Sequence, residues 1–342
     1  MIRRLALAVA ALLLLGWAIL HEVQQRWEQP LAIPPGGFVM TVAAGDSLRA
    51  VANRLHAQGH MPYPDLLILY GRWSGLDQQI KRGEYLLPQG TTALSLLNLL
   101  HSGKVVQYQV TLPEGITLAQ ALSILRQEDA LEKVITDVRD TKIEQLVQPW
   151  ISAEGLFFPD SYRYERGDSD WELLQRAHSA LQSVLAQEWA QRAAELPYET
   201  PYEALIMASI IEKETGAPEE REQIAGVFVR RLQQGMRLQT DPTVIYGLGE
   251  SFDGNLLRTH LKDAGNPYNS YRHRGLPPSP IALPGRAAIH AALHPAPGDA
   301  MYFVATGDGR HVFSATLAEH QRAVRKYQLR LYMDYRSRPE NI

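Results

Sequence analysis

Residues 204–215 form the segment best suited to chemistry, because the strongly apolar run ALIMASIIEKET carries a carboxylate where a core residue is expected. At 3.6 residues per turn, Glu212 falls on one stripe with Leu205 and Ser209, which points its side chain inward. Apolar surroundings disfavour the charged form of a carboxylate, so such a group is a natural general acid. One alternative stays open: a helix-end Glu212 in solvent or in a salt bridge with Arg221.

Glu214 follows two positions later but does not make a carboxylate pair with Glu212. Two helical steps turn a side chain by about 200°, so the two groups face opposite sides. A two-carboxylate glycosidase needs its groups on both sides of a sugar, roughly 5 to 9.5 Å apart. The nearest candidate partner is Asp241, in QTDPTVIYG. Without a partner, one Glu protonates the leaving oxygen and a hydroxyl of the substrate attacks, with no positioned water.

Other catalytic and metal-binding signatures are mostly missing from the sequence. It has no G-x-S-x-G elbow, S-x-x-K, P-loop or H-E-x-x-H, and it has no cysteine for a disulfide, a thiolate nucleophile or a zinc site. His290 and His294 have the i, i+4 spacing of two ligands on one helix face, but no nearby Asp, Glu or Cys completes a set. We therefore expect a packed helix end before Pro295, with no metal and no cofactor.

The segment 236–285 is dense in side chains that suit a sugar cleft. Carbohydrate sites combine apolar ring faces with planar hydrogen-bonding groups. Groups of this kind are Gln239, Asp241, Tyr246, Asn266, Tyr268, Asn269, Tyr271 and Arg272. An irregular surface loop has a similar composition, so both interpretations stay open.

Length and composition predict two globular units. The chain has 342 residues, of which 45% are hydrophobic and 21% are charged, too long for one typical domain and too apolar for disorder. The formal net charge is only −3, and no long stretch is uniformly basic, which argues against a nucleic-acid partner.

The N-terminus, residues 1–23, is interpreted as a transmembrane anchor. Arg3 and Arg4 precede an uncharged, almost wholly aliphatic run from Leu5 to Leu20. These 16 residues are at the short end for a bilayer core, which needs about 20, and they also resemble the apolar region of a signal peptide. A buried soluble helix is a further alternative, but it would have to begin at residue 1 with no polar face.

Two observations favour an anchor that is not cleaved. No small-x-small cleavage site follows the run, and Trp17 and Trp27 bracket its outer end as interfacial aromatics do. The positive N-terminus is then expected in the cytoplasm of a bacterium, with the chain crossing the inner membrane once and its bulk in the periplasm or facing the wall. Residues 24–37, which contain Pro and Gly, are interpreted as a stalk.

An internal similarity follows the stalk. Residues 42–48 (VAAGDSL) align with residues 112–118 (LPEGITL) at an offset of 70. In each copy a β-like segment runs into a Gly, then into a Ser or Thr N-cap and an amphipathic helix, and a strand-turn-helix pattern at 83–100 lies between them. The apolar face of the first helix comprises Leu48, Val51, Ala52 and Leu55, and that of the second Leu118, Ala121, Leu122 and Leu125.

The first copy resembles a LysM-type carbohydrate-binding module, in which V-x-x-G-D-S/T-L leads into a helix. The resemblance covers about twenty residues, and ordinary helix capping explains the same residue types. On this resemblance, residues 38–150 are interpreted as a small α/β LysM-like region that binds the cell wall.

The composition changes near residue 150, after which aromatic and Pro-rich motifs such as EGLFFPDSYRY replace the short repeats. Residues 151–342 are therefore expected to form a second, mainly helical domain, in an α+β protein. Periodicity predicts helices at about 170–195, 201–214 and 219–234, and a C-terminal β-hairpin pairs 302–305 with 311–314.

The motifs of this second domain resemble the endolytic murein transglycosylase family, the YceG-like proteins. They are, in order, ASIIEKET, GVFVRRLQQGMRLQTDPTVIYGLG, NPYNSYRHRGLPPSPIALPG and HPAPGDAMYFVATGDGRHVFSAT, and the likeness runs from about Glu154 to the C-terminus. The resemblance places the family's catalytic Glu on Glu212, through the E-x-E-T pattern. It places Gln239, Asp241, Asn269 and Tyr271 in the substrate cleft, without individual roles.

The resemblance implies a membrane-anchored lytic transglycosylase, a carbon-oxygen lyase that cuts peptidoglycan strands internally. The bond between N-acetylmuramic acid and N-acetylglucosamine would be cut without water, leaving a 1,6-anhydro-muramyl end. Glu212 would first protonate the glycosidic oxygen and then accept the proton of the attacking C6 hydroxyl. The implied partners are glycan strands, the lipid bilayer and peptidoglycan synthases, and the implied role is the termination of nascent strands.

Two other functions stay open on the sequence alone. One is a non-catalytic wall-binding tether or scaffold of a peptidoglycan synthesis complex. The other is an ordinary glycoside hydrolase in which Asp241 is the partner of Glu212.

Overall fold

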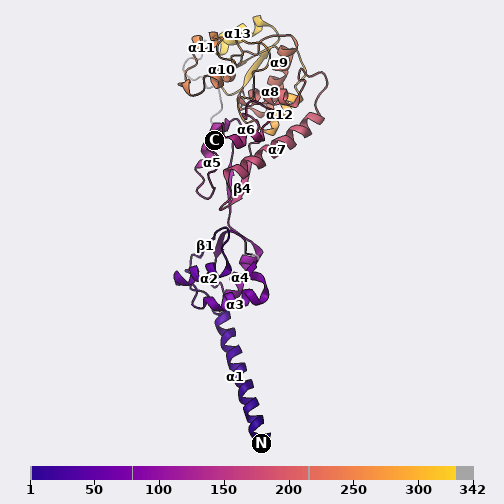
Figure 1. The fold of residues 1–342 in the computed structure, drawn as a ribbon. Coiled ribbons are helices and arrows are strands. Elements are labelled where there is room, and N and C mark those ends of the chain that lie inside the picture. The colour runs from indigo at the N-terminus through magenta and orange to yellow at the C-terminus, as the bar shows by residue number, and fades with distance from the viewer. Residues whose placement is uncertain (1, 79, 215, 329–342) are drawn as a thin grey trace. The chain divides into compact units, whose positions relative to one another are not determined.

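A computed structural model describes residues 2–78, 80–214 and 216–328, which divide into two compact units (Figure 1). The first unit comprises Met1–Gln109, Asp129–Glu132 and Arg163–Asp168, and the second comprises Val110–Glu128, Lys133–Tyr162 and Ser169–Ile342. Mixed helix and strand structure is confirmed for the chain.

The first unit has five helical elements and two strands of its own among the described residues. They are α1 (Ile2–Glu28), β1 (Phe38–Val42), α2 (Leu48–Ala57), α3 (Pro64–Ser74), the 3₁₀ turn η1 (Leu76–Gln78), β2 (Gly83–Leu87) and α4 (Ala93–Ser102).

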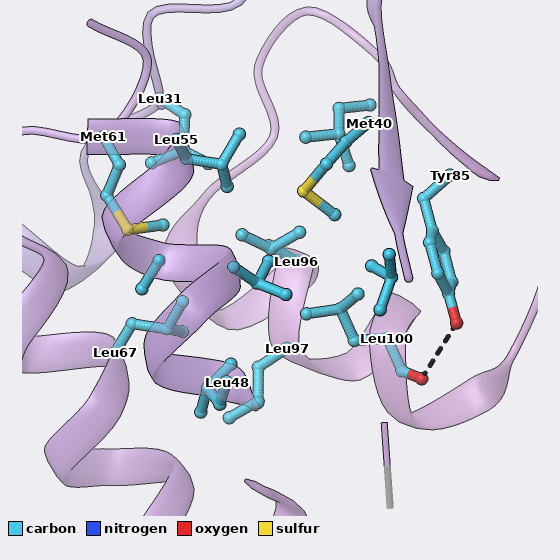
Figure 2. Close-up of a cluster of buried hydrophobic side chains, with 14 of the residues drawn as sticks. Leu31, Met40, Leu48, Leu55, Met61, Leu67, Tyr85, Leu96, Leu97 and Leu100 are labelled. Carbon is cyan, nitrogen blue, oxygen red and sulfur yellow. Dashed lines mark hydrogen bonds between the residues drawn. The ribbon is translucent and has the colours of Figure 1, made fainter. Parts of the chain in front are cut away.

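The core of the first unit forms where these helices meet the sheet of β1 and β2 (Figure 2). The strands pair antiparallel, with Met40 opposite Tyr85, and both side chains are buried. The Tyr85 hydroxyl donates to the carbonyl oxygen of Lys81 at 2.8 Å, so the ring is buried with its polar atom satisfied. The predicted apolar face of α2 is confirmed, because Leu48, Val51, Ala52 and Leu55 are all buried.

The helix α1 continues through Glu28, beyond the predicted anchor and into the predicted stalk. Within the described part of the chain, we find no helix whose length and apolar character together suffice for a membrane crossing. The predicted transmembrane helix is therefore not confirmed. Leu31 and Ile33 are buried in the core of the first unit and Trp27 packs against it, so much of the segment 24–37 belongs to this unit rather than to a free stalk.

Two strands cross the boundary between the units, β3 (Gln107–Thr111) and β4 (Ser161–Glu165), which pair in a two-stranded sheet. The remaining elements belong to the second unit: α5 (Leu118–Arg126), α6 (Thr141–Leu146), α7 (Asp170–Ala190), α8 (Pro201–Glu214), η2 (Pro218–Glu220), α9 (Arg221–Gln233), α10 (Asp241–Leu248), η3 (Gly249–Ser251), α11 (Arg258–Lys262), α12 (Arg286–Leu293), β5 (Tyr302–Ala305), β6 (His311–Ser314) and α13 (Leu317–Tyr327).

The helix α8 is the central element of the second unit. Every residue from Ala204 to Ile211 is buried, which fits a helix that is apolar on all sides. It contacts α7 and α9, which flank it in the chain, and also α10 and the more distant α12 (Figure 1). The three helices predicted for this region and the antiparallel hairpin of β5 and β6 are all present.

The second copy of the repeat lies in the second unit, so the predicted boundary at residue 150 falls inside that unit. Its turn is bound to the loop before α12, because Gly115 N donates to Leu283 O at 2.8 Å and Leu283 N donates to Ile116 O at 2.8 Å. These contacts join residues more than 160 positions apart. A likeness between two short segments carries no information on such distant contacts.

Candidate active site

Glu212 lies in the last turn of α8, with only 5% of its side chain exposed. Its Oε2 accepts the backbone N–H of Gly285 at 2.9 Å, and its Oε1 accepts a hydrogen bond from Nη2 of Arg221 at 3.4 Å. Both sequence interpretations therefore hold in part: the side chain points inward, and it also forms the Arg221 salt bridge. A buried charge needs such partners, since an unpaired one is strongly disfavoured.

Arg221 is itself largely buried, with 13% of its side chain exposed. Its Nε is buried and has no hydrogen-bond partner among the described residues. Buried donors are normally satisfied, so this atom is an exception to that rule.

Glu214 contacts another part of the unit, as the helical geometry predicts. Its Oε1 accepts a hydrogen bond from the hydroxyl of Thr240, directly before α10. The two glutamates of EKE therefore bind different neighbours, Glu212 the loop before α12 and Glu214 the loop before α10.

A cleft of about 1050 Å³ opens beside this end of α8. Lys213, the neighbour of Glu212 in the chain, lines it, together with Thr117 and Leu118 at the start of α5. Its aromatic side chains are Trp150, Tyr246 and Tyr268, and the last two meet edge to face at 4.8 Å. The combination of ring faces with polar groups is that of a carbohydrate site.

Glu154 is the buried carboxyl group of this cleft, with 7% of the residue exposed. Its Oε1 accepts the N–H of Leu118 at 2.9 Å and its Oε2 accepts the hydroxyl of Tyr246 at 3.3 Å. Burial raises the pKa of Glu154 to about 7, although both hydrogen bonds oppose the shift. The group therefore changes its protonation near neutral pH.

Glu154 was not predicted from the sequence to belong to a site. The motif EGLFFPDSYRY, which contains it, indicated only a change of composition. The usable signal is the one applied to Glu212, a single carboxylate beside an apolar run, here Gly155 to Phe158. Glu114, in the turn of the second repeat copy, was missed as well.

Asp241 and Tyr271 lie together, but neither is among the residues that line the cleft of about 1050 Å³, so their contact with substrate stays a prediction. The Tyr271 hydroxyl donates to Oδ1 of Asp241 at 2.7 Å. Burial, followed by the charge of Asp241, raises the pKa of Tyr271, which keeps this hydroxyl a donor. The carboxylate of Asp241 is thus oriented by Tyr271, whereas that of Glu212 is oriented by Arg221 and Gly285.

Gln239 and Asn269 have different surroundings. Gln239 is exposed and has a positive φ of 53°, a conformation that non-glycine residues seldom adopt. Asn269 is fully buried, its Nδ2 donates to the carbonyl oxygens of His260 and Asp263, and its Oδ1 accepts the N–H of Tyr271. Asn269 therefore holds the loop that carries Tyr271, and its predicted contact with substrate stays a prediction.

The pair His290 and His294 has an acidic neighbour after all. Glu188 of α7 places its Oε2 2.9 Å from Nδ1 of His290, and one ligand atom from each of the three residues lies within 4.8 Å of the others. The expectation that no acidic residue completes the pair was wrong, because 102 residues separate Glu188 from His290 in the chain. Arg286 also binds Glu188, at 3.2 Å, so a positive charge already occupies one side of this carboxylate.

Comparison with known proteins places these features in a family. The sequence profile described as the YceG-like family matches residues 40–326. A Bacillus subtilis (strain 168) protein named endolytic murein transglycosylase is 29% identical, over 94% of this chain and 91% of that protein. A protein of the same name from Streptococcus pneumoniae serotype 2 (strain D39) is 25% identical, over 84% of this chain and 57% of that protein.

A solved structure agrees with the sequence comparison. The crystal structure of a YceG-like protein from Listeria monocytogenes is similar with a TM-score of 0.54 and 26% identity, over 84% of this chain and 98% of that one. The profile match covers well over half of the sequence, and the buried Glu212 lies inside it. This chain belongs to the YceG-like family.

Proposed function

We propose that this chain is an endolytic peptidoglycan lytic transglycosylase. It cuts the bond between N-acetylmuramic acid and N-acetylglucosamine inside a glycan strand and leaves a 1,6-anhydro-muramyl end. The observation that carries the proposal is the buried Glu212 carboxylate, bound by Gly285 and Arg221 within the YceG-like match. The names of the relatives support the same activity.

The reaction needs two proton transfers and no water. The glycosidic oxygen gains a proton as its bond to C1 breaks, and the C6 hydroxyl loses a proton as its oxygen bonds to C1. A carboxyl group held beside C1 can stabilise the positive charge that develops there, and it can also take part in a proton transfer. Glu212 suits this role, because hydrogen bonds from Gly285 and Arg221 fix the orientation of its carboxylate before substrate binds.

The cleft suits a polymer of sugars. Its volume of about 1050 Å³ is at the upper end for ligand pockets, which span roughly 300 to 1,000 Å³. Tyr246, Tyr268 and Trp150 offer apolar faces to sugar rings, while Lys213 and Glu154 offer polar contacts. We assign the glycan strand to this cleft.

The location and partners in the cell form a further part of the proposal. We propose that α1 holds the chain at the bacterial inner membrane with the N-terminus in the cytoplasm, supported by its exposed apolar residues, among them Leu12, Leu13, Leu14 and Leu20. The first unit then keeps the chain near the wall as a LysM-like region, and the activity terminates nascent strands beside peptidoglycan synthases. Membrane fractionation of cells that express the full chain, against a variant with Leu13→Glu and Leu14→Glu, tests the anchor.

Product analysis tests the activity. Purified full chain is incubated with glycan strands, and the new ends are weighed by mass spectrometry. We expect muramyl ends that lack one water, lost in Glu212→Gln and largely kept in the matched control Glu214→Gln. Ordinary reducing ends would show hydrolysis, and strands that bind without being cut would show a tether. If Glu214→Gln alone lost activity, Glu214 would be the catalytic glutamate and the assignment to Glu212 would be wrong.

A further inference from the structure

A second carboxyl group, that of Glu114, lies against the same backbone position as Glu212. The N–H of Gly285 donates to Oε2 of Glu212 at 2.9 Å. A Cβ at residue 285 would lie 1.8 Å from Oε1 of Glu114 and 2.7 Å from its Oε2. The Glu114 carboxyl group thus fills the space that only a glycine leaves free, and both glutamates meet at Gly285.

The loop that carries Glu114 is held in place on both sides. Its neighbours Gly115 and Ile116 bind the backbone of Leu283 through two hydrogen bonds of 2.8 Å. Lys213 donates from Nζ to the carbonyl oxygen of Gly115 at 2.9 Å. A Cβ at Gly115 would stand 3.6 Å from Cγ of Glu212, so the turn packs directly on the catalytic side chain.

The two carboxyl groups differ in exposure and in partners. Glu114 is exposed, whereas Glu212 is almost covered and has an N–H and a guanidinium as donors. Partial burial, and then the charge of Glu212, raises the pKa of Glu114, against the opposing effect of Arg221. Where two carboxyl groups share a site, their repulsion favours a proton on one of them, and the raised pKa of Glu114 marks it as that one.

The loop also connects this pair with the cleft. Thr117 and Leu118, three and four residues after Glu114, line the cleft in which we place the glycan strand. Neither Glu114 nor Glu212 is among the residues that line the cleft, so the chain segment 114–118 is what joins the carboxyl pair to it.

We propose that Glu114 is a second catalytic residue, the proton donor to the glycosidic oxygen, and that Glu212 accepts the proton of the C6 hydroxyl. This inference rests on the proposed function. The proton of Glu114 goes to the leaving oxygen with the electron pair of the broken C1–O bond. The C6 oxygen forms its bond to C1 and loses its proton to Glu212. Transfer of that proton from Glu212 to Glu114 restores the starting state.

The test compares two substrates that differ only in their leaving group. One is a natural glycan strand, whose leaving oxygen needs a proton. The other is a nitrophenyl glycoside of a muramyl oligosaccharide, whose leaving group departs without one. The full chain is compared with Glu114→Gln, Glu212→Gln and a charge control, Glu222→Gln, an exposed residue beside Arg221 in α9. Circular dichroism confirms that each variant is folded.

We expect Glu114→Gln to cut strands at least about 100-fold more slowly than wild type and the nitrophenyl glycoside within a few-fold of wild type, since general acids contribute about 10²–10⁴. Glu212→Gln should lose both activities, and Glu222→Gln should lose neither. Gly285→Ala is a second route to the same result, because its Cβ expels the Glu114 carboxyl group while the backbone, at φ −75°, accepts alanine.

Two outcomes overturn the role of Glu114: wild-type cutting of strands by Glu114→Gln, or equal losses on both substrates, which would mark a structural residue. The proposed function fails separately, if wild type leaves ordinary reducing ends. In that case the leaving-group comparison still reports on Glu114. A wild-type chain that cuts neither substrate overturns both proposals.

Discussion

The two copies of the β-turn-α repeat share their local structure and differ in what surrounds the turn. Each turn contains a glycine with positive φ, 83° at Gly45 and 76° at Gly115, and each helix starts at a hydroxyl N-cap. In the first copy the acidic residue of the turn, Asp46, binds Arg54 of the following helix. In the second copy the acidic residue, Glu114, faces Gly285 and Glu212.

This difference shows how a structural module acquires a role in chemistry. The carboxylate of Asp46 is satisfied inside its own module, through Arg54 at 2.6 Å and the N–H of Ala43 at 2.9 Å. The carboxyl group of Glu114 precedes the glycine instead of following it, and so it projects away from its own helix toward another part of the unit. Matched variants of the two turns should therefore differ in their effect on activity.

The largest expected effect concerns Glu154, which binds the first N–H of the helix in the second copy only. Its pKa is raised from 4.5 to about 7, so ionisation is less favourable in the folded chain than in the unfolded one. Its stabilising contribution is complete below pH 4.5 and is lost as the pH rises through 7. The loss amounts to about 3 kcal/mol, from about 1.4 kcal/mol for each pH unit.

Glu154→Gln should remove this dependence. Relative to wild type, the variant should gain about 3 kcal/mol of unfolding free energy between pH 4.5 and pH 8, measured by urea unfolding at each pH. If the difference in unfolding free energy between the variant and wild type were the same at every pH, the pKa of Glu154 would not be raised by folding.

The next effect concerns the two turn glycines. Gly45→Ala and Gly115→Ala should each lower the unfolding free energy by about 1–2 kcal/mol, because both positions need the left-handed conformation. Only Gly115→Ala should also reduce kcat on glycan strands, since it shifts the loop that carries Glu114. Equal changes of kcat in the two variants would contradict the distinction between the copies.

A smaller and equal effect is expected at the N-caps. Ser47 accepts the N–H of Ala50 at 3.2 Å, and Thr117 accepts that of Gln120 at 3.3 Å. Ser47→Ala and Thr117→Ala should each cost about 1 kcal/mol in unfolding free energy. Thr117→Ser serves as the control that keeps the cap. A cost confined to one copy would show that the local structures are not equivalent.

The smallest effect belongs to Asp46. The hydrogen bond from Arg54, and then that from Ala43, lowers the pKa of Asp46 below 3.8. Its contribution is present above that pH and is lost as the pH falls through the lowered pKa. Asp46→Asn should therefore destabilise the first unit by a few tenths to about 1 kcal/mol at pH 7, and by less at pH 3. Hydrogen exchange of α2 at the two pH values measures the difference.

Much of the local structure follows from the sequence pattern. The apolar positions predicted for the second repeat helix, Leu118, Ala121, Leu122 and Leu125, are all buried, and periodicity located α8 with the same bounds as the structure. Helical geometry also separated Glu212 from Glu214, which bind different neighbours. These features depend on residues within a few turns of one another, so a local pattern contains the information.

The rest depends on contacts between distant residues. The pairing of Gly115 with Leu283, the position of Glu114 at Gly285, the Glu154 bond to Leu118 and the approach of Glu188 to His290 leave no trace in local periodicity. The sequence alone determined which residues are helical, which side of α8 holds a carboxylate and which family motifs the chain carries. Only the tertiary structure decided which other carboxyl groups lie near Glu212, because burial and charge act through space and not along the chain.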